Sequence, residues 1–411
     1  MFSWRETEEN IFTLLNAEKK ILQSGRLTVV KGFVPRKRIQ DLNKEVNGML
    51  EGKVLVLENE GTDEKEQLNL PTKISNSRFF KPFEEITKLY GLPTYSEIDP
   101  TPFLAITFPI LFGLMFGDLG HGLVLLFGGA AVGTLLKGNQ GIRNVGWIMS
   151  ACGFASCITG LLFGEAFGIK LPWGPLWFSP FEDVLSFLIF SMVVGIVQIL
   201  SGIIIEIANL VYKHKVVDAV LTAAPKIAFY LGGVYLIATY QLDFAAWLTG
   251  PILLPVIPFI IMVAGKPIYN KIAKTEKHET GEHEEQDSLV VRFFEGGDFF
   301  TRLLGNTISY SRILALLMAH WALLLVVYTV SELAVEAVGA GSILAVVLSG
   351  VIIIFGNIFV LALEGLIVFI HTLRLHFYEW FSKFYQGTGV EFSPFKQKFV
   401  YTDVELKGKK D

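Results

Sequence analysis

Two ionisable side chains lie inside a long apolar segment near residue 310. In the sequence NTISYSRILALLMAHWALLL, Arg312 and His320 are eight residues apart, so they share a helix face after about two turns. An arginine or lysine at the centre of a membrane helix costs about 2.5–3.5 kcal/mol on insertion scales. Three interpretations are open for Arg312: a fixed cation on this face, a side chain that reaches the membrane surface, or the partner of a carboxylate within the bundle.

A second apolar segment carries a stripe of polar residues. In GNIFVLALEGLIVFIHTLRLHFYEWF, the polar residues recur at intervals of seven, seven, three and four, which places them on one helical face: Asn357, Glu364, His371, Arg374 and Tyr378. Glu364 and His371 can exchange protons near neutral pH if their surroundings shift their pKa values. The stripe indicates the lining of an aqueous path, and the alternative is a set of hydrogen bonds between helices.

Two other polar pairs lie close to these segments. Asp298 and Arg302 open the segment that leads to residue 312, and they either line a water-filled mouth or lie at the membrane interface. Asp118 and His121 belong to GDLGHG (117–122), where three glycines permit a tight reversal of the chain. We expect these two residues to form a structural turn rather than to take part in catalysis.

Motifs for nucleotide and hydrolytic chemistry are absent from the sequence. There is no GxxxxGK[ST] phosphate loop, no GxSxG elbow and no zinc-ligand spacing. The sequence therefore predicts a chain that does not hydrolyse ATP by itself, with no cofactor and no metal. A net charge of −4 gives no indication of a nucleic-acid partner.

Composition indicates the elements that must position these side chains. The chain is 52% hydrophobic and only 18% charged, more apolar than soluble domains usually are. Its charged residues concentrate in the first hundred residues, one internal stretch and the C-terminus. Between them lie apolar runs of twenty or more residues, each long enough to cross a bilayer. We therefore predict an all-α polytopic membrane protein with a small soluble head.

About eight membrane helices are predicted. The stretch 103–137 is too long for one crossing and is expected to form two short helices that turn at 117–122. The remaining six are predicted at about 144–168, 184–212, 219–240, 245–264, 298–336 and 341–384. The last two are each about forty residues, so they must tilt strongly or project beyond the bilayer.

The distribution of Lys and Arg between the loops predicts the topology. Basic residues gather in the loops after the second, fourth and sixth predicted spans, and the opposite loops are poor in them. This bias places both termini, the loop 266–297 and the tail 386–411 in the cytoplasm. The membrane domain is accordingly predicted at 99–385.

The first 98 residues are predicted to be a small soluble α/β segment. A polar helix near 4–23 is followed by a strand at 25–34, a helix that Pro35 opens, and a strand at 53–58. Residues 79–92 are predicted to form a short amphipathic helix at the membrane surface.

Three sequence segments carry a resemblance to a known family. TPFLAITFPILFGLMFGDLGHGLVL, SYSRILALLMAH and LEGLIVFIHTLRLHFYEWFSKFYQGTGVEFSPF follow one another as they do in the a/I subunits of V-type and archaeal-type rotary ATPases. The segment VVKGFVPRKRIQDL also resembles part of the cytoplasmic arm of that family. Together the segments cover nearly the whole predicted membrane region.

The resemblance implies roles for individual residues. Arg312 matches the arginine that faces the essential carboxylate of the rotor ring, and Arg374 matches a second arginine on the neighbouring helix. Glu364, His320 and His371 match positions associated with the two half-channels for the ion. Asp298, Arg302, Asn357 and Tyr378 are then candidates for lining these half-channels.

The resemblance further implies a stator subunit that couples proton or Na⁺ transport to ATP hydrolysis or synthesis in other subunits. Its implied partners are the rotor ring, the central and peripheral stalks, the lipid bilayer and the transported ion, in a prokaryotic cell membrane. The family's cytoplasmic domain is usually much larger than the 98 residues found here, so the chain is either a fragment or a shortened homologue.

Two other function classes predict different sequence features. A stand-alone secondary transporter predicts internal repeats with paired broken helices, and no convincing repeat is present. A purely structural anchor predicts no buried charges, which Arg312 and Glu364 contradict. The stator interpretation is favoured over both.

Overall fold

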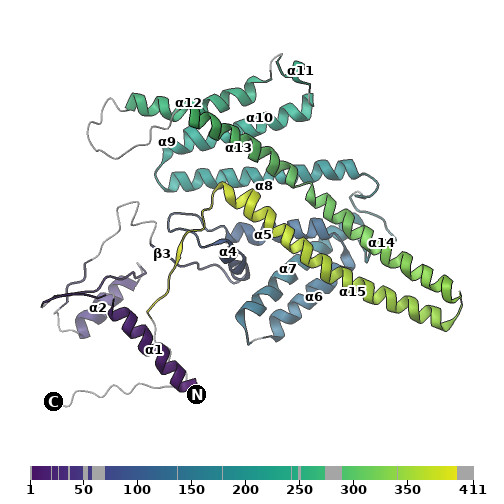
Figure 1. Cartoon of the computed structure of the whole chain (residues 1–411), viewed down its shortest axis with the longest axis horizontal. Coiled ribbons are helices and arrows are strands. Elements are labelled where there is room, and N and C mark those ends of the chain that lie inside the picture. Colours follow the sequence, from purple (N-terminus) through teal and green to yellow (C-terminus); the bar gives the residue numbers. More distant parts are fainter. Residues whose placement is uncertain are drawn as a thin grey trace. The chain divides into compact units, whose positions relative to one another are not determined.

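The computed structural model consists mostly of helices and divides into two compact units (Figure 1). It describes residues 2–19, 21–25, 27–35, 38–49, 54–57, 70–136, 138–177, 179–241, 243–248, 251–273, 289–339 and 341–395. The first unit comprises Met1–Lys73 and Thr388–Asp411, and the second comprises Ile74–Gly387. Parts of the predicted loop 266–297 and tail 386–411 lie outside the described residues.

The first unit contains two helices and short strands. Its elements are α1 (Phe2–Glu18), β1 (Leu22–Ser24), β2 (Leu27–Val29), α2 (Ile39–Met49), β3 (Pro71–Thr72) and β6 (Val390–Glu391). β1 and β2 pair antiparallel, whereas β3 and β6 pair parallel. No residue of α2 is buried, as expected for a segment too small to enclose a core.

The predicted β-α-β order of the first unit is only partly correct. A helix does lie within the stretch that follows Pro35, and β2 lies within the predicted strand 25–34. β2 pairs with residues 22–24, although the helix predicted near 4–23 was expected to include Leu22 and Gln23, and the described residues 54–57 form no strand. The run KVLVLE has the composition of a strand, but composition yields a strand only where a neighbouring edge is available for pairing.

Residues 74–98 pack with the helical unit. They contain η2 (Lys81–Phe83) and α4 (Glu84–Tyr90), in agreement with the short helix predicted at 79–92. Phe83 is buried against Phe108 of the first apolar helix, with ring centroids 6.5 Å apart. α4 ends at Gly91, whose φ of 148° and close approach to the backbone of Gly387 admit no side chain.

The next three helices form a tightly packed group: α5 (Thr101–Phe116), α6 (Leu119–Leu135) and α7 (Gln140–Phe163). The predicted reversal at 117–122 is confirmed, because α5 ends and α6 begins there. α6 and α7 approach closely through glycines, and a Cβ added to Gly129 would lie 2.6 Å from the carbonyl oxygen of Gly146. Small residues permit such close helix packing in membranes.

A short hairpin and a second group of helices follow: β4 (Glu165–Ala166), β5 (Ile169–Lys170), α8 (Val184–Tyr212), α9 (Val216–Asp218), η3 (Ala219–Ala223), α10 (Ala224–Tyr240), α11 (Phe244–Leu248) and α12 (Leu253–Ala273). α9, η3 and α10 run on without a break, and η3 is a short π-helical stretch. α10 and α12 lie side by side (Figure 1).

The C-terminal part of the second unit contains the longest helices: α13 (Leu289–Ser309), α14 (Arg312–Val338), α15 (Ile343–Arg374), η4 (Leu375–Trp380) and η5 (Phe381–Lys383). The single helix predicted at 298–336 is interrupted at Tyr310 and Ser311, whose amides bond three residues back rather than four. Such tightening inside a helix often marks a hinge or functional position. α14 and α15 run side by side (Figure 1).

The helix lengths agree with an all-α membrane protein. Among the described residues, five helical stretches are long and apolar enough to span a membrane: Gln140–Phe163, Val184–Tyr212, Val216–Tyr240, Gly296–Val338 and Ile343–Lys383. Three shorter apolar helices occupy Thr101–Phe116, Leu119–Leu135 and Leu253–Tyr269. These eight segments correspond in position to the eight predicted spans, although the number of crossings stays a prediction.

Candidate functional site

Arg312 is the first residue of α14, immediately after the interruption of the long helix. Its Nη1 atom lies 3.7 Å from Oε1 of Glu379, which η4 supplies. The Arg312 side chain is 15% exposed and the Glu379 side chain is 4% exposed. This contact is an ion pair inside the bundle, and Nη1 of Arg312 forms no hydrogen bond within the described residues.

Arg374 and His371 lie near this pair and close to a change in helix type. Arg374 is the exposed last residue of α15, and the chain continues as the π-helix η4. Both Arg374 and His371 are within electrostatic range of Arg312. We refer to Arg312, His371, Arg374 and Glu379 as the arginine region.

His320 and Glu364 meet in the contact between α14 and α15. A hydrogen bond of 2.5 Å joins Nδ1 of His320 and Oε2 of Glu364. Both side chains are almost fully buried, with 2% and 3% exposed. The structure thus brings together two residues that the sequence places on different helices.

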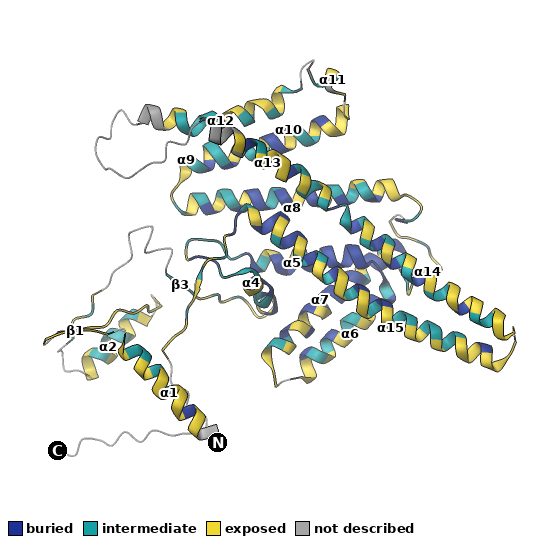
Figure 2. Ribbon diagram, in the orientation of Figure 1, coloured by how far each residue is buried: buried dark blue, intermediate teal, exposed yellow. Residues whose placement is uncertain are grey.

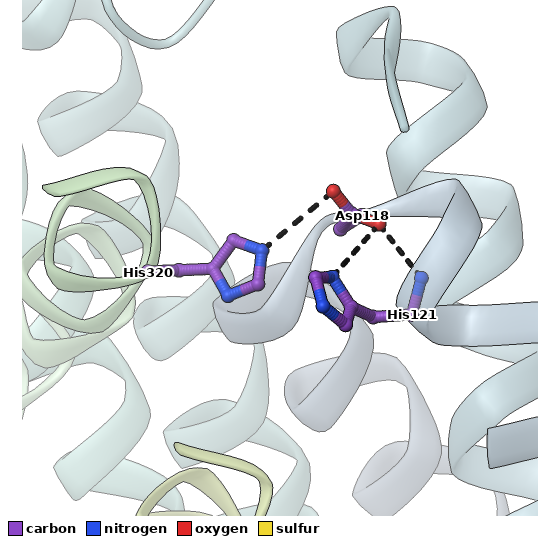
Figure 3. Close-up of side chains that lie close together, drawn as sticks. All are labelled: Asp118, His121 and His320. Atoms are coloured by element: carbon purple, nitrogen blue, oxygen red, sulfur yellow. Dashed lines mark hydrogen bonds and ion pairs between the residues drawn. The ribbon is translucent and has the colours of Figure 1, made fainter. Parts of the chain in front are cut away.

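Asp118 and His121 complete this buried group from the turn between α5 and α6 (Figure 3). Oδ1 of Asp118 accepts a hydrogen bond from the amide of His121, so Asp118 caps α6. Oδ2 accepts one from the amide of Gly168 and lies 3.7 Å from Nε2 of His320. We refer to Asp118, His121, His320 and Glu364 as the buried cluster.

Several polar atoms of the buried cluster have no hydrogen-bond partner within the described chain. They are both ring nitrogens of His121, Nε2 of His320 and Oε1 of Glu364. Nδ1 of His121 is 3.2 Å from Oδ1 of Asp118 but lacks hydrogen-bond geometry. Buried polar atoms are paired in the great majority of cases. A group of unpaired atoms is therefore suited to exchanging a proton or holding an ion.

Comparison with known proteins identifies the family. Residues 3–181 and 261–397 match the model of the V-type ATPase 116kDa subunit family. The chain belongs to this family. The match does not favour a stand-alone transporter, and it agrees with the family that the three sequence motifs indicate.

Curated relatives of this family member are named A-type ATP synthase subunit I. The chain is 32% identical to the A-type ATP synthase subunit I of Aeropyrum pernix, over 95% of this chain and 60% of that protein. It is 30% identical to the subunit I of Pyrococcus abyssi, over 91% of this chain and 54% of that protein. The chain thus spans little more than half the length of these relatives.

The four other residues predicted to line the half-channels lie in surroundings that differ from those of the buried cluster. Asp298 and Arg302 form a 2.7 Å ion pair one turn apart on α13, and both side chains are more than half exposed. Asn357 donates from Nδ2 to the carbonyl oxygen of Ile353 in its own helix. Tyr378 is 72% exposed on η4. Within the described part of the chain, these four residues form no hydrogen bond or ion pair with the buried cluster.

The polar stripe predicted along the eighth span does not have one environment. Glu364 is buried against α14, whereas Arg374 and Tyr378 are exposed. Tyr378 lies beyond the start of η4, where the wider π-helical turn changes the angular position of each residue. A count based on a regular α-helix cannot anticipate that change.

Sequence reasoning missed three residues of the site. Glu379 is the partner of Arg312, and Asp118 and His121 were interpreted only as turn residues. The prediction of a structural turn is correct, because Asp118 caps α6, but it did not include the contact between Asp118 and His320. The available signal was that all three are ionisable residues inside otherwise apolar sequence, which is the same signal that identified Glu364.

One acidic residue outside the membrane-length helices borders the buried cluster. Glu165 lies in β4, between α7 and α8, and is 4% exposed. Burial raises the pKa of Glu165 to about 7, and the nearby charge of Asp118 adds to this effect. The protonation state of Glu165 therefore changes near neutral pH.

Proposed function

We propose that this chain is the membrane-embedded stator subunit of a rotary A/V-type ATPase. It conducts H⁺ or Na⁺ past a rotor ring and so couples ion transport to ATP hydrolysis or synthesis in other subunits. The observation that carries the proposal is that α14 and α15 hold a permanent cation, Arg312, apart from a buried carboxylate–imidazole pair, Glu364 and His320. Membership of the family supports it.

Arg312 acts on the rotor carboxylate by charge. An opposite charge within about 4–6 Å favours the ionised form of a carboxylate, so a ring carboxylate that reaches Arg312 releases its ion. Glu379 holds Arg312 between such encounters. The charge of an arginine persists even where a lysine would lose its proton, and it blocks direct leakage between the half-channels.

The buried cluster carries protons within one half-channel. The imidazole of His320 lies between two carboxylates, with Nδ1 bonded to Glu364 and Nε2 facing Asp118. An imidazole can accept a proton at one ring nitrogen and release a proton from the other. Asp118, His320 and Glu364 therefore provide successive proton sites that link the turn before α6 to α15.

The rotor ring covers the outer face of α15. This helix is the least buried of the five membrane-length stretches, and Figure 2 shows exposed residues along its length. Its exposed residues are large and apolar: Ile354, Phe355, Ile358, Phe359, Leu366 and Ile370. Arg374 is exposed at the end of the same helix. A continuous apolar face of this kind requires lipid or protein to cover it.

The remaining assignments follow from the membrane topology. We place residues 1–98 and 386–411 in the cytoplasm, where they contact stalk subunits, and residues 99–385 in a prokaryotic cell membrane with eight crossings. The bias of Lys and Arg between loops supports this orientation. Two ion pairs at the ends predicted to be cytoplasmic, Lys226–Glu206 and Lys266–Asp218, agree with it.

Reconstitution of the complete complex in vesicles tests the proposal. The Arg312→Ala variant is expected to keep ATP hydrolysis while ATP-driven ion uptake falls by about tenfold or more, as a barrier raised by at least about 1.4 kcal/mol requires. Arg143→Ala is the matched control, because among the described residues the side chain of Arg143 hydrogen-bonds to Gln140 in the first turn of α7. Uptake near the wild-type level in an assembled Arg312→Ala complex would show that Arg312 is structural.

A further inference from the structure

Asp118, His121 and His320 present a set of metal-ligating atoms. One ligand atom from each lies within 4.8 Å of the other two, and all three residues are at most 1% exposed. Figure 3 shows the three side chains converging from the N-terminal end of α6, where Asp118 is the cap and His121 lies in the first turn, and from α14. One carboxylate oxygen and two imidazole nitrogens form a donor set that Zn²⁺ commonly accepts.

Surrounding groups hold two of these ligands in orientation. Nδ1 of His320 is bonded to Glu364, which directs Nε2 of the same ring toward Asp118. Histidines that bind metals usually give their other ring nitrogen to a carboxylate in this way, which fixes the tautomer. The amide of Gly168 bonds to Oδ2 of Asp118 and fixes the carboxylate.

The imidazole ligand atoms lack competing partners. Both ring nitrogens of His121 and Nε2 of His320 have no hydrogen-bond partner within the described chain. The other walls are aromatic. The ring centroids of Phe116 and His320 are 4.9 Å apart, and those of Phe167 and His121 are 5.1 Å apart. Buried imidazole nitrogens in apolar surroundings gain strongly from a ligand that accepts their lone pairs.

We propose that Asp118, His121 and His320 bind one divalent transition-metal ion of the Zn²⁺ class. In a tetrahedral zinc site, bonds of about 2.0–2.1 Å place neighbouring ligand atoms about 3.3 Å apart. The observed separations are 3.2 Å from Oδ1 of Asp118 to Nδ1 of His121 and 3.7 Å from Oδ2 of Asp118 to Nε2 of His320, both close to that spacing.

The donor set also determines which ions are excluded. Mg²⁺ and Ca²⁺ require oxygen ligands almost exclusively, whereas two of the three ligands here are nitrogens. The site is distinct from the arginine region, because no hydrogen bond or ion pair among the described residues joins its three ligands to Arg312 or Glu379. Metal binding is therefore expected to leave the arginine region unchanged.

A bound metal has a functional consequence, which rests on the proposed function. An ion on Asp118 and His320 occupies the atoms that the proposed proton path uses, so Zn²⁺ would stop ion uptake. Binding itself does not depend on transport. If the purified chain binds Zn²⁺ but the assembled complex transports no ions, the proposed function is contradicted and the metal site stands.

The experiment measures binding to the purified full-length chain in detergent. After treatment with a chelator, equilibrium dialysis against Zn²⁺ followed by metal analysis is expected to give one tightly bound Zn²⁺ per chain and no Mg²⁺. His121→Gln is expected to weaken Zn²⁺ binding by at least about tenfold, and Glu364→Gln, a positioning change, by about tenfold. Unchanged Zn²⁺ binding in folded His121→Gln would overturn the proposal.

The matched control is another buried histidine. In His376, Nδ1 is bonded to the carbonyl oxygen of Thr372 and Nε2 to the hydroxyl of Thr107, so its ring has no nitrogen free for a metal. His376→Gln is expected to leave Zn²⁺ binding unchanged, and a loss equal to that in His121→Gln would overturn the assignment.

X-ray absorption on the zinc-loaded wild-type chain keeps the test independent of any variant. The proposal predicts a nitrogen and oxygen shell at about 2.0–2.1 Å that includes scattering from two imidazoles. A shell without imidazole scattering, or a sulfur shell at about 2.3 Å from Cys152 or Cys157, would overturn it.

Discussion

The arginine region and the buried cluster contain similar ionisable groups in opposite settings. In the arginine region, Arg312 and Arg374 outnumber the carboxylate of Glu379, and both arginines lie where a regular helix starts or ends. In the buried cluster, every side chain is almost fully enclosed, and backbone amides fix Asp118 in place.

This difference separates two requirements of an ion path. A group that meets a moving partner must remain accessible and able to change its contacts, which the ends of α14 and α15 allow. A group that passes ions within the protein must be held at a fixed distance from the next, which burial and helix capping provide. Substitutions in the two regions should therefore affect stability and transport in different proportions.

The largest effect on stability is expected from His320→Ala. Removing one partner of a buried charged pair costs about 3–5 kcal/mol, because the remaining carboxylates of Asp118 and Glu364 stay buried without it. Arg374→Ala, at an exposed position of the arginine region, should leave the melting temperature unchanged. Thermal unfolding of both variants in detergent measures the difference. Equal melting temperatures for the two variants would contradict the expectation that the buried cluster contributes more to stability than the arginine region.

A smaller effect on stability is expected in the arginine region itself. Arg312→Ala leaves Glu379 buried without its cation and should cost about 1–3 kcal/mol, the usual penalty for an unsatisfied buried group. The double variant Arg312→Ala/Glu379→Ala removes both charges and should recover most of that loss. Thermal unfolding of both single variants and the double variant measures the coupling. Additive losses would show that the 3.7 Å contact contributes nothing to stability.

The smallest effect concerns Glu165, at the edge of the buried cluster. Burial raises its pKa from 4.5 to about 7, so the folded chain binds the proton more tightly than the unfolded chain. The stabilising contribution is complete below pH 4.5 and is lost as the pH rises through 7. Glu165→Gln should remove this part of the pH dependence of the melting temperature. Identical pH profiles for both chains would contradict the assigned pKa.

The sequence was sufficient for much of the helical unit and for part of the site. Long apolar runs predicted the positions of the membrane-length helices, and the glycines of GDLGHG predicted the turn between α5 and α6. Arg312, His320 and Glu364 were found because an ionisable residue in an apolar run has a large cost and therefore requires a partner or a function.

The features that the sequence did not predict depend on contacts between residues that are far apart in the chain. Asp118 and His320 are about two hundred residues apart, so their approach is a property of helix packing. Glu379 lies in the π-helical stretch after Arg374, where regular α-helical periodicity does not give the position of a side chain. The described residues 54–57 of the predicted strand 53–58 form no strand for a related reason, since strand pairing depends on a distant edge.

The central claim is that Arg312 is the fixed cation that an ion-carrying rotor passes. Ion uptake by vesicles that contain the complex with Arg312→Ala/Glu379→Ala tests it most directly, because this variant lacks the charge without leaving a carboxylate unpaired. The account predicts an assembled complex that hydrolyses ATP and takes up no ions. ATP-driven uptake near the wild-type level in that complex would contradict the account.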